Sequence, residues 1–223
     1  MIDVQSLRFA RLKFDFDRER AMKEIVPLLP LMDWAKSAPY FKSVVLPFTV
    51  ASAEEERAYA GSNYFSWKTI GLTHIPGVET SKLGRSSSRN RNVIAQWQWR
   101  EDIVVPYLKE LVAALPFESI QSIRVIALFP GHVGGVHHDD TLGMFYNAGA
   151  RSVTLNISDG GQRLEFMQHG QHYTLSNYPA FIFRDDCYHG VRKVDSLRAQ
   201  LRINGLFAPG MADLVDQKAS LAV

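Results

Sequence analysis

From residue 120 onward the chain is a series of short segments rich in β-branched and aromatic residues, and this pattern leaves few possible folds. Gly, Asn, Asp and Pro separate the segments, and turn signals stand at 158–162 and 168–171. Short strands at regular spacing, with no helical pattern between them, are typical of an antiparallel barrel or sandwich. The predicted strands cover residues 120–129, 151–158, 163–168, 171–176, 180–184 and 198–207.

The residues before this series have a mixed pattern. Acidic residues followed by apolar residues at helical spacing predict a helix over 15–29. Another amphipathic pattern predicts a helix over 100–116, with Glu101 and Asp102 near its start and Pro116 just past its end. A further helix is predicted over 51–61, and strands are predicted over 7–16 and 63–75.

The length of the chain indicates one domain. Its 223 residues, 46% of them hydrophobic, can bury one sizeable core. We therefore expect a single α+β domain with a jelly-roll-like (cupin-like) β core and helical N-terminal additions. The expected parts are a mostly helical part with a few strands over 1–118, the β core over 119–207 and a C-terminal tail over 208–223.

Charge and composition exclude several classes of partner. The 25 basic and 23 acidic residues leave a net charge of +2, so no nucleic-acid or anionic membrane partner is indicated. No apolar run reaches the roughly 20 residues of a membrane span. Cys187 is the single cysteine, which suits a reducing compartment, and charges stand near the N-terminus where a secretory signal is apolar. We therefore expect a soluble, cytoplasmic protein.

The stretch GHVGGVHHDDT, residues 131–141, combines metal-binding side chains with glycines at a density that chance rarely produces. In it a histidine and an aspartate stand two positions apart in two overlapping ways, His137 with Asp139 and His138 with Asp140. Alternate residues of an extended segment share a face, so only one of these pairs can face inward. The spacing alone leaves both pairs open.

A further metal ligand is predicted in the stretch FRDDCYHGV, where His189 follows a buried-strand pattern. Two histidines and one carboxylate on one face of an iron(II) ion leave positions open for a co-substrate and dioxygen. His132, His169 and His172 compete for the role, but the last two stand at a turn and at the start of the next strand. His189 is therefore the favoured third ligand.

The segment SLRAQLRINGLF places Arg198, Gln200 and Arg202 on one face of a strand and apolar residues on the other. A planar guanidinium makes paired hydrogen bonds to a carboxylate, so two arginines near an iron ion can bind a dicarboxylate. The alternative is a basic strand edge that faces solvent.

These stretches, in this order, resemble the iron(II)- and 2-oxoglutarate-dependent dioxygenases. FPGHVGGVHHD, ARSVTLNI and YHGVRKVDSLRAQLRINGLF are most similar to the group of aspartyl/asparaginyl β-hydroxylase and the bacterial cis-proline hydroxylases, over roughly residues 119 to 207. The resemblance implies a double-stranded β-helix, iron(II), and 2-oxoglutarate and dioxygen as co-substrates. It also implies hydroxylation of an unactivated carbon, with succinate and carbon dioxide as co-products.

The resemblance also bears on the choice of ligands. A Pro-Gly pair precedes the first histidine ligand of these hydroxylases, so Pro130-Gly131 favours His137 and Asp139, with His189 as the distal ligand. An aspartate at the carboxylate position implies hydroxylation, because related halogenases leave that position vacant for chloride.

The same resemblance implies roles for arginines. The family spacing favours Arg198 over Arg202 as the partner of the far carboxylate of 2-oxoglutarate. Arg151 matches an arginine that touches the co-substrate, although Val153 stands where the family has a histidine.

The sequence gives only hints about the substrate. Tyr64 and Trp67 stand where related small-molecule hydroxylases often carry an aromatic substrate wall, although the same pattern fits plain core. The polar segment 80–92 is interpreted as a lid or a surface loop. We expect a small molecule, an amino acid or a derivative of one. The alternatives are an oxygenase acting on a protein or nucleic acid, and a non-catalytic cupin-like ligand-binding protein.

Overall fold

The computed structural model describes residues 3–4, 7–34, 67–76, 97–132, 134–137, 151–159, 164–168, 171–174, 178–183, 189–191 and 194–222. The helix predicted over 51–61, the segment 80–92 and Tyr64 lie outside these residues. No helix of the described part is both long and apolar enough to cross a membrane.

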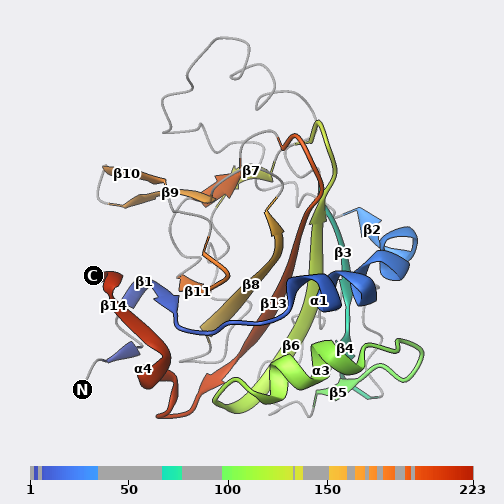
Figure 1. Ribbon diagram of the computed structural model, residues 1–223, viewed down its shortest axis with the longest axis horizontal. Coiled ribbons are helices and arrows are strands. Elements are labelled where there is room, and N and C mark those ends of the chain that lie inside the picture. Colours follow the sequence, from blue (N-terminus) through green and yellow to red (C-terminus); the bar gives the residue numbers. More distant parts are fainter. Residues whose placement is uncertain are drawn as a thin grey trace.

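Two antiparallel sheets dominate the structure (Figure 1). The larger sheet contains, in order, β14 (Val215–Ala222), β1 (Leu7–Leu12), β11 (Ala180–Phe183), β8 (Arg151–Asp159), β13 (Arg198–Phe207), β6 (Phe117–Leu128), β3 (Trp67–Gly71) and β2 (Asp33–Trp34). The smaller sheet contains β10 (Gln171–Thr174), β9 (Leu164–Gln168), β12 (His189–Val191) and β7 (Gly134–His137). Two short strands, β4 (Thr73–His74) and β5 (Gln98–Trp99), pair separately.

From β6 to β13 the chain crosses repeatedly between the larger and the smaller sheet. β6, β8, β11 and β13 are neighbours in the larger sheet, whereas β7, β9, β10 and β12 form the smaller one. The pairings among these strands are antiparallel. This arrangement of eight strands in two sheets is a jelly roll, or double-stranded β-helix. The predicted fold, an α+β domain with a jelly-roll core and helical N-terminal additions, is therefore confirmed.

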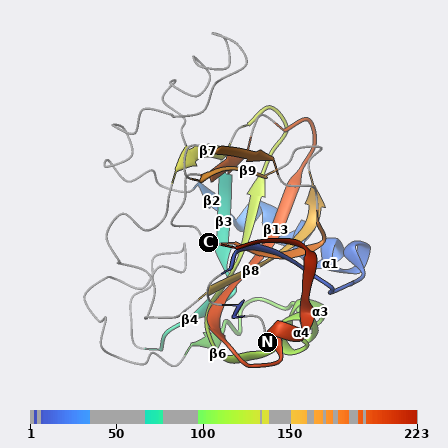
Figure 2. The same cartoon turned by 90° about the vertical axis from the view of Figure 1, so that its left-hand side faces the viewer.

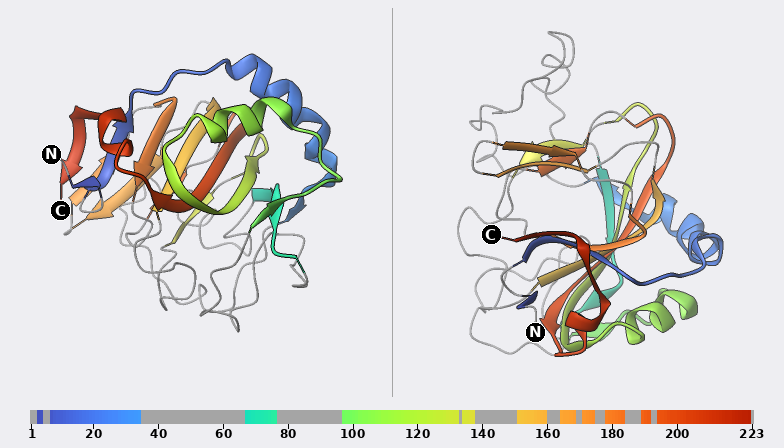
Figure 3. Two further views of the ribbon diagram at one scale, coloured as in Figure 1. Left: turned by 90° about the horizontal axis from the view of Figure 1, so that it is seen from below. Right: turned by 60° about the vertical axis from the view of Figure 1, so that its left-hand side comes forward.

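The two faces of the larger sheet have different surroundings. The helices α1 (Arg18–Ile25) and α3 (Pro106–Ala113) cover one face, and the smaller sheet lies on the other side (Figure 3). The helix-covered face buries aliphatic side chains, among them Leu155, Leu201 and Ile203 at 0% exposure. We call the opposite face the inner face. The apolar cluster on this side includes residues of the smaller sheet and consists of Phe9, Leu128, Phe181, Phe183, Val191 and Val194, with Trp67 and Tyr178 packed against it.

Segments outside the predicted β core extend the larger sheet. β1, β2 and β3 from the N-terminal part join it, and the segment expected as a C-terminal tail forms α4 (Met211–Leu214) and β14. β14 pairs with β1, so strands from the two ends of the described chain lie side by side (Figure 2). The helix predicted over 15–29 is divided into α1 and a 3-10 helix, η2 (Val26–Leu31), which has Pro27 in its first turn. Proline interrupts helical hydrogen bonding, which explains the division.

α3 is shorter than the helix predicted over 100–116. It begins at Pro106, so Glu101 and Asp102 precede it and do not occupy its first turn. The side chain of Asp102 accepts hydrogen bonds from Arg100, and these hold the pKa of its carboxyl below the usual value. The predicted start of this helix was therefore wrong.

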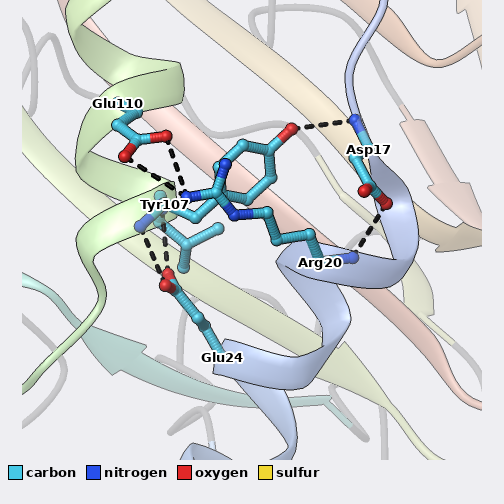
Figure 4. Close-up of polar contacts among 6 residues, drawn as sticks. Asp17, Arg20, Glu24, Tyr107 and Glu110 are labelled. Atoms are coloured by element: carbon cyan, nitrogen blue, oxygen red, sulfur yellow. Dashed lines mark hydrogen bonds and ion pairs between the residues drawn. The ribbon is translucent and has the colours of Figure 1, made fainter.

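The start of α3 is fixed by α1 (Figure 4). The backbone N–H groups of Tyr107 and Leu108 donate to the two carboxylate oxygens of Glu24 at 2.8 and 2.9 Å. The Tyr107 hydroxyl accepts from the backbone N–H of Asp17 at 2.8 Å, and the Arg20 guanidinium carbon lies 4.1 Å from the centroid of the Tyr107 ring. The cap of α3 thus comes from a residue distant in the sequence, which local patterning cannot reveal.

Candidate functional site

His189 begins β12 and is buried, with 4% of its surface exposed. In the antiparallel pairing it lies directly opposite His137, the last residue of β7, and opposite Phe166 of β9 on its other side. Positions directly opposite each other in an antiparallel pair share a face of the sheet. The fold therefore brings together two positions that the sequence predicts as metal ligands.

Other residues of the predicted metal motif lie outside the described residues. They are Asp139 and the alternative pair His138 and Asp140. Among the competing histidines, His132 is partly exposed after β6, and its backbone carbonyl accepts from the N–H of Val194 at 3.0 Å. The described residues alone contain no group of three or more His, Cys, Asp or Glu side chains that can hold a metal ion.

Arg198 and Arg202 lie on the inner face of β13 and are buried, with 2% and 7% of their surface exposed. Leu201 and Ile203, on the alternate positions, belong to the helix-covered core. β13 lies between β8 and β6, so it is an interior strand and not a solvent-facing edge. Two guanidinium groups are therefore held in the low-dielectric interior beside the smaller sheet.

Arg202 belongs to a hydrogen-bond network that spans β8, β13 and β6. Its Nε donates to Ser152 Oγ at 3.3 Å, and the Ser152 hydroxyl donates to Asn204 Oδ1. The Asn204 side-chain nitrogen donates to Ser122 Oγ at 2.7 Å. Ser152 and Asn204 are 2% and 3% exposed, so this network fixes one end of the guanidinium away from bulk water.

A second polar pair stands next to this network. Gln200 Nε2 donates to Asn156 Oδ1 at 2.5 Å, and the Asn156 amide donates to the backbone carbonyl of Tyr178 at 2.7 Å. The sequence predicts a strand over 151–158, but the prediction gives no role to its polar residues Ser152 and Asn156. The feature of the sequence that could have revealed them is the polar side chain at every second position of that strand. This alternation places Ser152 and Asn156 on the inner face.

Phe183, the last residue of β11, links Arg202 with His189. Its ring centroid lies 5.0 Å from that of His189, with the ring planes at 72°, an edge-to-face arrangement. The guanidinium carbon of Arg202 lies 5.5 Å from the centroid of the same ring. One aromatic side chain thus contacts residues of β12 and of β13, where the two sheets meet.

The remaining described residues differ: Arg151 lies on the other face of the larger sheet, whereas Trp67 lies on the inner face, opposite Leu128. Arg151 pairs with Gly205 at the start of β8, on the strand face that carries Val153 and is covered by the helices. The structure thus does not bring Arg151 together with the arginines of β13. Trp67 begins β3 and packs against the apolar cluster of the inner face. Tyr64 lies outside the described residues.

Neither a protein-family model nor a curated protein matches the chain. Solved structures do match it. One is a prolyl hydroxylase from Trichoplax adhaerens, in complex with a peptide fragment of the hypoxia inducible factor oxygen degradation domain. It has 9% sequence identity and a TM-score of 0.47, and the match covers 94% of this chain and 87% of that one.

Two bacterial structures are also similar. A prolyl-4-hydroxylase from Pseudomonas putida has 12% identity and a TM-score of 0.47, over 92% of this chain and 96% of that one. An oxidoreductase of the 2OG-Fe(II) oxygenase family from Burkholderia pseudomallei has 11% identity and a TM-score of 0.39, over 62% of this chain and 65% of that one. Since these scores lie below 0.5, we base the functional proposal on the site residues.

Proposed function

We propose that this chain is an iron(II)- and 2-oxoglutarate-dependent oxygenase that hydroxylates a carbon atom of a small molecule, an amino acid or a derivative of one. The observation that carries the proposal is the register of β12 and β7, which sets His189 opposite His137. Residues directly opposite each other share a face of the sheet, so this pairing supports two histidines far apart in the sequence as ligands of one metal ion. Two imidazoles with an aspartate two residues after the first form a donor set that suits iron(II).

His137, Asp139 and His189 would hold the metal. Asp139 follows His137 by two positions, and alternate residues of an extended segment share a face, so the pairing of His137 with His189 supports Asp139 as the carboxylate ligand. An iron(II) ion held by this set would supply the activation of dioxygen, with 2-oxoglutarate as the co-substrate that is converted to succinate and carbon dioxide.

Arg198 would bind the far carboxylate of 2-oxoglutarate. Arg198 is 2% exposed and lies on the inner face, the side of the larger sheet on which the smaller sheet with His189 lies. A paired hydrogen bond between guanidinium and carboxylate is stronger there than in water, because the local dielectric is low. The buried position also orients the co-substrate and keeps water from it.

The choice between the two overlapping His-x-Asp pairs can be tested by substituting neighbouring residues. We expect His137→Ala to abolish iron(II) binding and succinate formation, because it removes a ligand opposite His189. His138→Ala is the matched control and should keep measurable activity. Iron(II) titration and succinate assays check both. If His138→Ala is inactive and His137→Ala is active, the ligand pair is instead His138 with Asp140.

The reaction and the substrate class can be tested together. Protein incubated with iron(II), ascorbate, 2-oxoglutarate and cell metabolites should add one oxygen atom to a small molecule, detected by mass spectrometry. Free amino acids, peptides and RNA are then compared as substrates. A gain of oxygen on peptides or RNA alone would assign a macromolecular substrate. Absence of dioxygen-dependent 2-oxoglutarate turnover would leave a cupin-like binding protein.

A further inference from the structure

We propose that Phe183 is a positioning residue: its ring fixes the orientation of the His189 imidazole, and Arg202 acts by holding that ring in place. This inference rests on the proposed function, since its effect is exerted on a metal ligand. It assigns different roles to the two buried arginines of β13.

The backbone register fixes where His189 lies but not how its ring is turned. A metal needs one particular ring nitrogen, so neighbours that lock the imidazole orientation contribute to affinity. The Phe183 ring meets the His189 ring at 5.0 Å and 72°, an arrangement that aromatic quadrupoles favour. The two residues are 8% and 4% exposed, so rotation of the imidazole would disrupt a packed contact.

Arg202 is well placed to hold the phenyl ring. Its guanidinium carbon lies 5.5 Å from the centroid of Phe183, within the range of cation–π attraction. Its Nε is fixed by Ser152, whose hydroxyl donates in turn to Asn204. The ring of Phe183 is therefore in contact with a group that is anchored to neighbouring strands of the larger sheet.

The positions of the two arginines support a division of roles. Arg198 and Arg202 are four positions apart on one strand, so their Cα atoms are separated by roughly 13 Å at the usual rise per residue. Arg202 is directed toward Ser152 and Phe183 by its contacts. We therefore assign Arg202 to the support of Phe183, and Arg198 stays the arginine proposed above for the co-substrate.

The test measures Mn(II) affinity of metal-free protein by electron paramagnetic resonance. Phe183→Leu should weaken Mn(II) binding by about three- to tenfold, the range expected for loss of one aromatic contact. Phe183→Tyr keeps the ring and should restore affinity to within about twofold. The matched control is Phe207→Leu, because Phe207 makes an edge-to-face contact of the same kind with Phe117, at 5.4 Å and 63°, near the other end of β13 from Arg198. This control variant should lower the melting temperature, as Phe183→Leu does, but it should leave the Mn(II) affinity unchanged.

A double-mutant cycle tests the role of Arg202. Arg202→Gln should weaken Mn(II) binding in the wild-type background and have no further effect in the Phe183→Leu background, because both changes remove the same contact. Additive effects would overturn the assignment of Arg202.

Failure of this inference is distinguishable from failure of the proposed function. If wild-type protein binds no Mn(II), both fail. If wild-type protein binds Mn(II) and His189→Ala does not, but Phe183→Leu binds Mn(II) as tightly as wild-type protein, only the positioning role is overturned.

Discussion

Arg198 and Arg202 have the same chemistry and share one strand face, so only their surroundings distinguish them. Arg202 contacts Ser152 and Phe183, and Arg198 stands four positions earlier, at the start of β13. Alternation in the sequence predicted that the two side chains share a face, and the structure places both there. The sequence did not predict the contacts of Arg202, because Ser152 and Phe183 belong to strands that are distant from β13 in the sequence.

The arginine that binds 2-oxoglutarate can be identified by conservative substitution. Lysine keeps the positive charge but loses the paired hydrogen bonds. We expect Arg198→Lys to raise the half-saturating 2-oxoglutarate concentration by an amount equivalent to about 1.5–3 kcal/mol, the cost of one charge-assisted hydrogen bond. Arg202→Lys should have a smaller effect. Succinate formation at varied 2-oxoglutarate gives both values, and a change in neither variant would contradict the co-substrate assignment.

At the scale of elements, the first turn of α3 depends on a carboxylate from another helix. Glu24→Ala leaves the N–H groups of Tyr107 and Leu108 without their acceptor, so we expect it to lower the free energy of unfolding by about 1–3 kcal/mol. Urea denaturation measures the change. Glu19→Ala is a control on the same helix, because Glu19 forms only an exposed ion pair with Lys23. Equal shifts of the urea midpoint would contradict the capping role.

The strands of the β core were predicted more accurately than the helix boundaries and than the strand expected over 7–16, which ends at Leu12. The strands predicted over 151–158 and 180–184 agree with β8 and β11 to within one residue at each end. Their ends could be predicted because turn residues next to them in the sequence mark where each strand stops. The start of α3 was misplaced because its cap is Glu24, which only tertiary packing brings near. The sequence likewise could not show that His189 pairs with His137, since strand register is a long-range property.

At the scale of the whole molecule, the larger sheet separates two kinds of core. Its helix-covered face is aliphatic, whereas its inner face combines aromatic residues with buried arginines and the amide and hydroxyl groups that bind them. Burial of a polar group lowers the stability of the fold unless the group is hydrogen-bonded, as the groups in the network of Arg202, Ser152 and Asn204 are. The aliphatic face thus supplies stability, and the inner face supplies the polar groups of the candidate site.

The pairing of β1 with β11 and β14 has a consequence for the kinetics of folding. These contacts join positions as distant as Leu7 and Ala222, so they close very long loops and should form after the transition state. Ala10 in β1 is fully buried, and Ala10→Gly should therefore speed unfolding about two- to fivefold while leaving the refolding rate unchanged. Stopped-flow measurements across a range of urea concentrations separate the two rates. A slower refolding limb would instead place β1 in the folding nucleus.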